Sequence, residues 1–209
     1  MRISSRAVWA ATATAVLVAA VTFVAADQAS AARPWAKARV VDARNVKLGD
    51  VTFTTPRGSS RTVVAVKFRG HSGDDVNRFH GFHIHANDNP TNGHGCIADV
   101  TQAPSTWFVS ADGHWKNDPT ELHGHHAGDL PSVFVNNDGT TELRFAVSKL
   151  SPSQVIGRAL VLHSAADNFG NVPVGPGPAQ YTPGAEALAT TQGTGNAGAR
   201  IACGVIVAG

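Results

Sequence analysis

Short runs of β-forming residues separated by turn residues fill the chain after Pro34, and they constrain its fold more than any other feature. The runs at 62–68 and 141–147 alternate apolar and polar residues, as strands with one buried face do. Asp138-Gly139 lies between two runs and is a strong hairpin-turn signal. No segment has a convincing helical period. The strands that we expect are 38–42, 50–54, 62–68, 79–85, 132–136, 141–147, 158–163 and 201–207.

This pattern predicts an all-β sandwich or barrel that is interrupted by two long irregular segments, 86–131 and 164–199. Both segments are too long for ordinary connections in a compact domain, and such loops are usually functional or disordered. The first contains several histidines and one cysteine. The second is rich in Gly, Pro, Ala and Thr, and its only charged residues are Asp167 and Glu186.

The N-terminus has the features of a secretory signal peptide. Arg2 and Arg6 precede an apolar run at 7–26, which is followed by the small-residue pattern Ala29-Ser30-Ala31. We expect cleavage after Ala31, although the run is long enough to act as an uncleaved membrane anchor. The sequence therefore predicts a signal peptide at 1–31 and one secreted or extracytoplasmic domain at 32–209, without a membrane segment in its mature form.

The chain has only two cysteines, Cys96 and Cys203. Neither lies near the predicted cleavage site, which excludes a bacterial lipoprotein anchor. In an oxidising compartment we expect them to form a disulfide that closes a long loop, and the alternative is two buried free thiols.

The formal net charge of +2 includes the basic residues of the predicted signal peptide. The rest of the chain has neither a cluster of Lys and Arg nor a basic stripe interleaved with aromatic residues. We therefore expect no nucleic-acid partner.

All ten histidines fall between His71 and His163, which indicates a metal site. His83 and His85 flank one residue in a predicted strand, so their side chains project from the same face and can bind one ion. On its own, a His-x-His pattern is also typical of two half-exposed strand histidines that bind no metal. The residues that favour the metal are those that follow along the chain: His114, His123, His126, Asp129 and His163.

Several motifs together resemble those of copper/zinc superoxide dismutases. The run at 80–85, His-Gly-Phe-His-Ile-His, is similar to the first signature of that family, and the segment at 195–206 is similar to the last. Between them, the segments at 113–114, 122–129 and 161–167 occur in the order of the family. The resemblance covers the chain from about Ala38 onward. It implies a Greek-key β-sandwich or flattened barrel of about eight antiparallel strands.

The resemblance also implies a binuclear metal centre that disproportionates two superoxide anions to dioxygen and hydrogen peroxide. The copper ligands would be His83, His85, His114 and His163. The zinc ligands would be His114, which bridges the two ions as an imidazolate, with His123, His126 and Asp129. His125 is the alternative to His126, and the three-residue spacing to Asp129 favours His126.

Further roles follow from the same resemblance. Asp167 would link a copper histidine to a zinc histidine, and His114 would also donate a proton to the departing peroxide. Arg200 would attract and orient superoxide, and His80 would tie loops together. We assign no role to His71, His94 and His125, and expect them to be solvated. Because the segment at 164–199 has so little charge, Lys116 and Lys149 are the alternative sources of electrostatic attraction.

Two other functions fit a metal-binding sandwich: storage or delivery of copper or zinc, and a metal-stabilised structural domain without turnover. The presence of all the expected copper ligands together with Arg200 favours the enzyme. We expect superoxide to be its small-molecule substrate, and the sequence leaves a homodimer open.

Overall fold

The computed structural model describes residues 35–169 and 187–209, so the predicted signal peptide at 1–31 and Glu186 lie outside the described residues. Short helical turns occur at Gly73–Asp75, Pro104–Thr106 and Val109–Ala111. The α-helices of the described residues are α1 (Pro152–Val155) and α2 (Ala187–Thr194). The strands are β1 (Ala36–Asp42), β2 (Lys47–Thr54), β3 (Thr62–Phe68), β4 (Arg78–His80), β5 (Phe82–His85), β6 (Val133–Val135), β7 (Thr141–Val147), β8 (Ala159–His163) and β9 (Arg200–Ala208).

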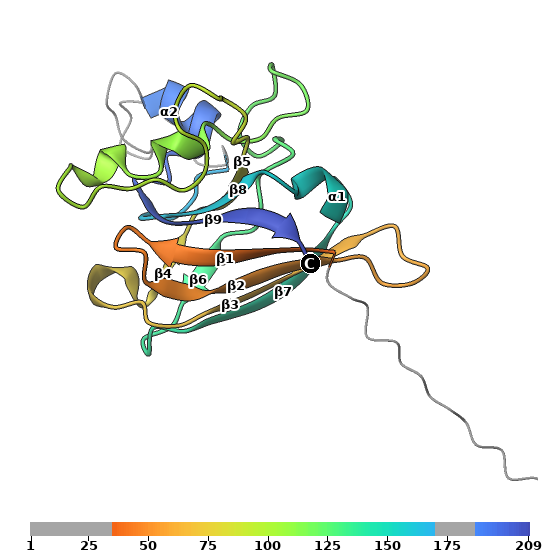
Figure 1. The fold of residues 1–209 in the computed structure, drawn as a ribbon, viewed down its shortest axis with the longest axis horizontal. Coiled ribbons are helices and arrows are strands. Elements are labelled where there is room, and N and C mark those ends of the chain that lie inside the picture. Colours follow the sequence, from red (N-terminus) through yellow and green to blue (C-terminus); the bar gives the residue numbers. More distant parts are fainter. Residues whose placement is uncertain (1–34, 170–186) are drawn as a thin grey trace, which may run out of the picture. The chain divides into compact units, whose positions relative to one another are not determined.

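Seven strands form one antiparallel sheet in the order β5-β8-β9-β1-β2-β3-β7, and β4 pairs with β6 in a second, two-stranded sheet (Figure 1). The large sheet curls into a half barrel, and the small sheet continues its wall. This arrangement confirms the predicted all-β, Greek-key class.

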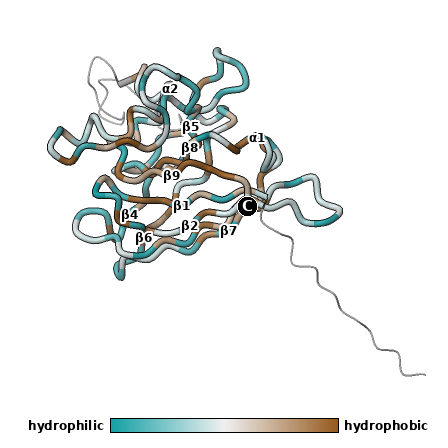
Figure 2. The backbone as a smooth tube through the Cα atoms, viewed as in Figure 1, coloured by the Kyte–Doolittle hydropathy of each residue, from teal (hydrophilic) through white to brown (hydrophobic). Residues whose placement is uncertain are grey.

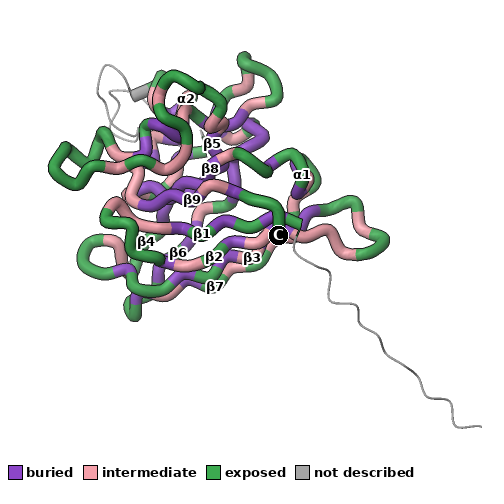
Figure 3. The backbone as a smooth tube through the Cα atoms, viewed as in Figure 1, coloured by how far each residue is buried: buried purple, intermediate pink, exposed green. Residues whose placement is uncertain are grey.

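The core is built by alternate residues of the strands, as their period of two predicts. Along β3, for example, Val64, Val66 and Phe68 are buried. Figure 2 shows the apolar residues concentrated on the strands, and Figure 3 shows the same segments buried. In β5 and β8 every residue is buried, because the core lies against one face and the long loops cover the other. The histidines of these strands occupy that covered second face.

The predicted strand at 79–85 is divided at Gly81 into β4 and β5, which belong to different sheets. At Gly81 a Cβ atom would lie 2.6 Å from the Cβ of Ala197, so only glycine lets the chain change sheets here. The Asp138-Gly139 turn does reverse the chain, and Gly139 N donates to Asn136 O at 2.9 Å. The strands on its two sides, however, pair in different sheets.

Two short helices occur although no segment has a convincing helical period. The four-residue α1 begins with a capping box, in which Gln154 Oε1 accepts from Ser151 N at 2.8 Å. The eight-residue α2 lies in the second long segment. Both helices are too short to show a helical period in the sequence.

Cys96 and Cys203 form the predicted disulfide, with their Cα atoms 5.5 Å apart. The bond joins the first long segment to β9. Among the described residues, no helix combines the length and apolar character needed to cross a membrane.

Candidate metal centre

The site is assembled on β5, which brings both long segments to one place. His83 and His85 point to the same face of this strand, and His163 ends the adjacent strand β8. Two isolated backbone bridges then attach the first long segment to β5, because His114 lies opposite His85 and Asp129 lies opposite His83. Residues far apart in the sequence are thereby fixed by backbone hydrogen bonding.

One group of four buried histidines offers nitrogen atoms that all lie within 4.8 Å of one another: His83, His85, His114 and His163. His83 Nδ1 and His114 Nε2 are buried and have no hydrogen-bond partner, and His85 Nε2 lies 3.4 Å from His163 Nε2. Burying polar nitrogen atoms without partners is costly. A metal ion that prefers imidazole, such as copper, would satisfy them.

The outer nitrogens of these rings are occupied, which fixes the orientation of each ring. His85 Nδ1 donates to Asp112 O at 2.8 Å, and His163 Nδ1 donates to Gly198 O at 3.2 Å. His83 Nε2 bonds to Asp167 Oδ2. Such outer hydrogen bonds set the tautomer that leaves the inner nitrogen free for a metal.

A second group surrounds Asp129. Its Oδ1 lies 2.9 Å from His114 Nδ1, 3.2 Å from His123 Nδ1 and 3.2 Å from His126 Nδ1. The Nδ1 atoms of His126 and His114 are 3.4 Å apart. Tetrahedral zinc with bonds of about 2.0–2.1 Å separates its ligands by about 3.3 Å, so these four side chains fit a closed zinc site.

His83 also lies within 4.8 Å of His114, His123 and Asp129, and its unpartnered nitrogen is Nδ1, because Nε2 is bonded to Asp167. Asp129 Oδ2 accepts from the backbone N–H of Gly124 at 2.7 Å and of His126 at 3.0 Å, which turns Oδ1 toward the three rings. His126 is fully buried and faces Asp129, whereas His125 is exposed.

Asp167 connects the two groups from the second long segment. Its Oδ2 bonds to His83 Nε2, and its Oδ1 lies 2.6 Å from His123 Nε2. Gly195 closes over this bridge, since a Cβ atom there would collide with Asp167 Oδ1 and His123 Nε2. Its φ of +67° also favours glycine.

The electrostatics of the two groups differ. Burial lowers the pKa of His83 and His85 well below the ordinary value, and burial lowers the pKa of His163 to about 3. Burial also opposes charge on His123, but Asp129 and Asp167 outweigh it and raise the pKa of His123 to about 9. Neutral imidazoles suit metal binding in the first group, and the carboxylates supply negative charge to the second.

Arg200 begins β9 beside the first group and is half-buried. Its guanidinium donates to two backbone carbonyls, those of Phe108 and, at 2.6 Å, of Asp112. After burial and neighbouring histidines, the positive charge of Arg200 further lowers the pKa of His85 and His163. A fixed cation therefore stands next to the four neutral rings.

The remaining histidines differ in their surroundings. His80 is fully buried, and its ring bonds to His163 O at 2.7 Å and to Asp75 O at 2.8 Å, so it links two segments. His94 and His125 are exposed, as expected. The expectation for His71 was wrong, because it is only 7% exposed and packs edge-on against Phe68. Its burial depends on tertiary packing that no sequence spacing reveals.

Two supporting contacts were not predicted from the sequence, in which Lys149 was considered only as an alternative source of electrostatic attraction. Lys149 Nζ donates to the carbonyl of His126 at 2.8 Å, and Asp112 O accepts from both His85 and Arg200. Backbone carbonyls make these contacts possible, and a sequence motif does not show where a carbonyl points.

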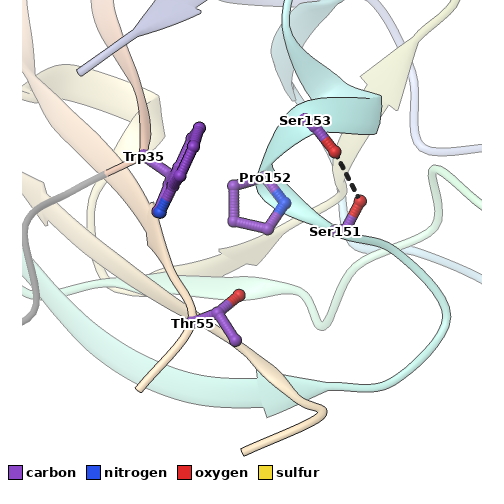
Figure 4. Close-up of a pocket in the computed structure, with 5 residues that line it drawn as sticks. All are labelled: Trp35, Thr55, Ser151, Pro152 and Ser153. Atoms are coloured by element: carbon purple, nitrogen blue, oxygen red, sulfur yellow. Dashed lines mark hydrogen bonds between the residues drawn. The ribbon is translucent and has the colours of Figure 1, made fainter. Parts of the chain in front are cut away.

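An apolar hollow of about 240 Å³ lies on another part of the surface, and none of its lining residues belongs to the histidine cluster (Figure 4). The ring of Trp35 faces that of Pro152 across it, and Thr55, Ser151 and Ser153 complete the lining. It has no titratable side chain and offers no chemistry comparable to that of the histidine cluster.

Comparison with known proteins agrees with this geometry. A family model described as copper/zinc superoxide dismutase matches residues 47–206. A copper-zinc superoxide dismutase of Photobacterium leiognathi is 28% identical over 170 residues, which cover 77% of this chain and 84% of that protein. One from Mycolicibacterium paratuberculosis is 36% identical over 141 residues, or 63% of this chain and 57% of that protein. The solved structure described as the clock protein EA4 matches with a TM-score of 0.58 at 26% identity. The match covers 83% of this chain and 94% of the EA4 chain.

Proposed function

The chain belongs to the copper/zinc superoxide dismutase family and is a superoxide dismutase, and we infer that two donor groups sharing His114 carry its reaction. The reaction converts two superoxide anions and two protons to dioxygen and hydrogen peroxide. Copper and zinc are its cofactors. Copper would be held by His83, His85, His114 and His163, and zinc by His114, His123, His126 and Asp129.

The observation that carries this assignment is the convergence of buried ring nitrogens that lack hydrogen-bond partners. His83 Nδ1, His114 Nε2 and His123 Nδ1 are buried and lack a hydrogen-bond partner. The other nitrogen of each of these rings is bonded to a carboxylate. Bound copper supplies a centre that accepts and returns one electron, whereas bound zinc supplies charge without redox change.

His114 is the side chain that both groups share. Its Nδ1 faces Asp129 at 2.9 Å, and its Nε2 faces the other three histidines of the first group. Nδ1 would therefore bind zinc, and Nε2 is the atom that would bind copper or hold a proton. A proton held there lies where the peroxide product needs one.

Arg200 would attract and orient the substrate. Superoxide is a small anion, and the guanidinium remains charged at every working pH. Its two carbonyl contacts hold it beside His85 and His163 without neutralising it, because carbonyls carry no net charge. It can therefore bind the anion through donors that are already oriented.

Metal analysis together with stopped-flow decay of superoxide tests the assignment. Loaded wild-type protein should hold one copper and one zinc, and His163→Ala should lose copper and turnover while retaining zinc and the fold. His94→Ala, which changes an exposed histidine outside both groups, is the matched control. Near-wild-type turnover of copper-loaded His163→Ala would refute the ligand assignment. Full metal binding by the wild type without turnover would favour a storage or structural domain.

The location and assembly of the protein are further proposals. The disulfide fits an oxidising compartment, which supports secretion with removal of residues 1–31. We also propose a homodimer. N-terminal sequencing of the secreted protein tests cleavage, and light scattering tests the dimer, with a monomer mass at working concentration counting against it.

A further inference from the structure

Asp112 has a backbone conformation that side-chain-bearing residues rarely adopt. Its φ is 66° and its ψ is −160°, a region that is populated almost only by glycine. The residue lies two positions before His114 and directly after the short helical turn Val109–Ala111. Such a conformation persists only where surrounding contacts hold it.

Those contacts come from the carboxylate of Asp112. Its Oδ2 accepts from the backbone N–H of Asp88 at 2.7 Å and of Asn89 at 3.0 Å, and its Oδ1 accepts from the side-chain amide of Asn92. The segment from 88 to 92 directly follows β5 and is mostly exposed. The side chain therefore attaches a surface loop to the residue that holds the unusual conformation.

The same conformation directs the carbonyl of Asp112 toward the site. This oxygen accepts from His85 Nδ1 at 2.8 Å and from Arg200 Nη2 at 2.6 Å. The other guanidinium donor binds the carbonyl of Phe108, whose φ is also positive at 57°. Since rotation about φ also turns the carbonyl of the residue, a normal φ at Asp112 would move this oxygen away from both of its donors.

We propose that Asp112 is a positioning residue, whose carboxylate locks its own backbone so that one carbonyl holds both the His85 tautomer and the Arg200 guanidinium. The inference rests on the proposed roles of His85 and Arg200. It assigns to this chain a hydrogen-bonded path from the surface segment at 88–92 to the group that receives the substrate. The determinant is the hydrogen bonding of the side chain, and its negative charge is not required.

Three substitutions separate these possibilities. Asp112→Ala removes all three side-chain hydrogen bonds. Asp112→Asn removes the charge and the acceptor for Asn92, but keeps an acceptor for the N–H groups of Asp88 and Asn89. Asp112→Gly relieves the backbone strain but removes the tether. Asp99→Ala is the matched control, because Asp99 is an exposed aspartate of the same loop whose carboxylate accepts from Thr101.

The main measurement is made on metal-free protein, so that it does not depend on copper. An arginine-selective dicarbonyl reagent is added, and modification of Arg200 is followed by mass spectrometry as loss of tryptic cleavage after it. Asp112→Ala and Asp112→Gly should react several-fold faster than the wild type, whereas Asp112→Asn and Asp99→Ala should react at the wild-type rate. In copper-loaded protein, only Ala and Gly at this position should change the Cu(II) electron paramagnetic resonance spectrum.

Turnover should follow the same order, with Asp112→Ala about 10-fold slower, as is typical for partners that orient metal ligands. Wild-type Arg200 reactivity in a folded Asp112→Ala protein would overturn the proposal, and so would an Asn variant that behaves like Ala. If Asp112→Ala fails to fold, Asp112→Gly removes the same three side-chain hydrogen bonds without the backbone strain and should still accelerate modification. If modification of Arg200 leaves wild-type turnover intact, the proposed role of Arg200 fails while its positioning by Asp112 stands.

Discussion

Removing the disulfide should separate the stability of the metal loop from that of the sandwich. The bond closes a loop of 107 residues. In the loop-entropy model a closure of this length stabilises the folded state by about 4.8 kcal/mol, near the upper end of the usual range of 2–5 kcal/mol. The Cys96→Ala/Cys203→Ala variant should lose free energy of unfolding of this order.

Local contacts predict which part loosens first. Ser110 Oγ bonds to Gly95 O at 2.7 Å and to Ile97 N at 3.0 Å, on either side of Cys96. Ile97 O accepts from Phe108 N at 2.7 Å, and Phe108 O in turn accepts from Arg200. Without the covalent bond, the segment would be held against β9 by these hydrogen bonds and by the small apolar cluster around Phe108 and Cys203.

Urea unfolding of metal-free wild-type and variant protein, followed by circular dichroism, measures the global effect. Arg200 modification in the absence of urea measures the local one and should accelerate in the variant while the circular dichroism spectrum is unchanged. Reduced metal-free wild-type protein should behave like the variant, which separates loss of the disulfide from the effect of the two alanine side chains. A loss below about 1 kcal/mol, the size of one ordinary hydrogen bond, would refute the loop-entropy reasoning. Arg200 exposure that appears only at global unfolding would refute the local part.

Three further outcomes are expected. His126→Ala should bind less zinc and melt lower than His125→Ala, because only His126 faces Asp129; equal zinc content and Tm would mean that the wrong histidine was chosen. Burial lowers the pKa of His71 below 6.5, so the unfolded chain binds the extra proton and stability falls as pH drops below about 6.5. The Tm of His71→Leu should therefore fall less than that of the wild type when the pH is lowered from about 7.5 to about 5. Equal decreases in Tm would exclude His71 as a cause of the acid destabilisation. Added salt should slow superoxide decay by wild-type enzyme but barely affect Arg200→Ile, and identical salt slopes would place the attracting charge on other residues.

The strands could be predicted because one face of each is buried, so that apolar and polar residues alternate along the sequence. The run at 62–68 coincides with β3 and that at 141–147 with β7. The division at Gly81 was not predictable, because it depends on the close approach of Ala197, more than a hundred residues away. Short helices such as α1 depend on local capping instead of a repeating pattern.

A metal site could be predicted because histidines cluster in one part of the chain, whereas the assignment of ligands to copper and zinc came from the family resemblance. The supporting contacts could not, since they depend on backbone oxygens and on burial. Asp112 looks like an ordinary loop aspartate until its φ is known, and His71 looks solvated until its packing against Phe68 is seen.

The two donor groups are joined by two side chains that come from different long segments. His114, from the first segment, offers one ring nitrogen to each group, and Asp167, from the second, bonds to one histidine of each. Neither link depends on core packing, because both lie on the outer face of β5. If the two groups hold copper and zinc as proposed, loss of one metal would remove the partner that fixes the shared ring for the other. Zinc binding would then be coupled to the copper half through His114 directly, and through Asp167 by way of His123 and His83.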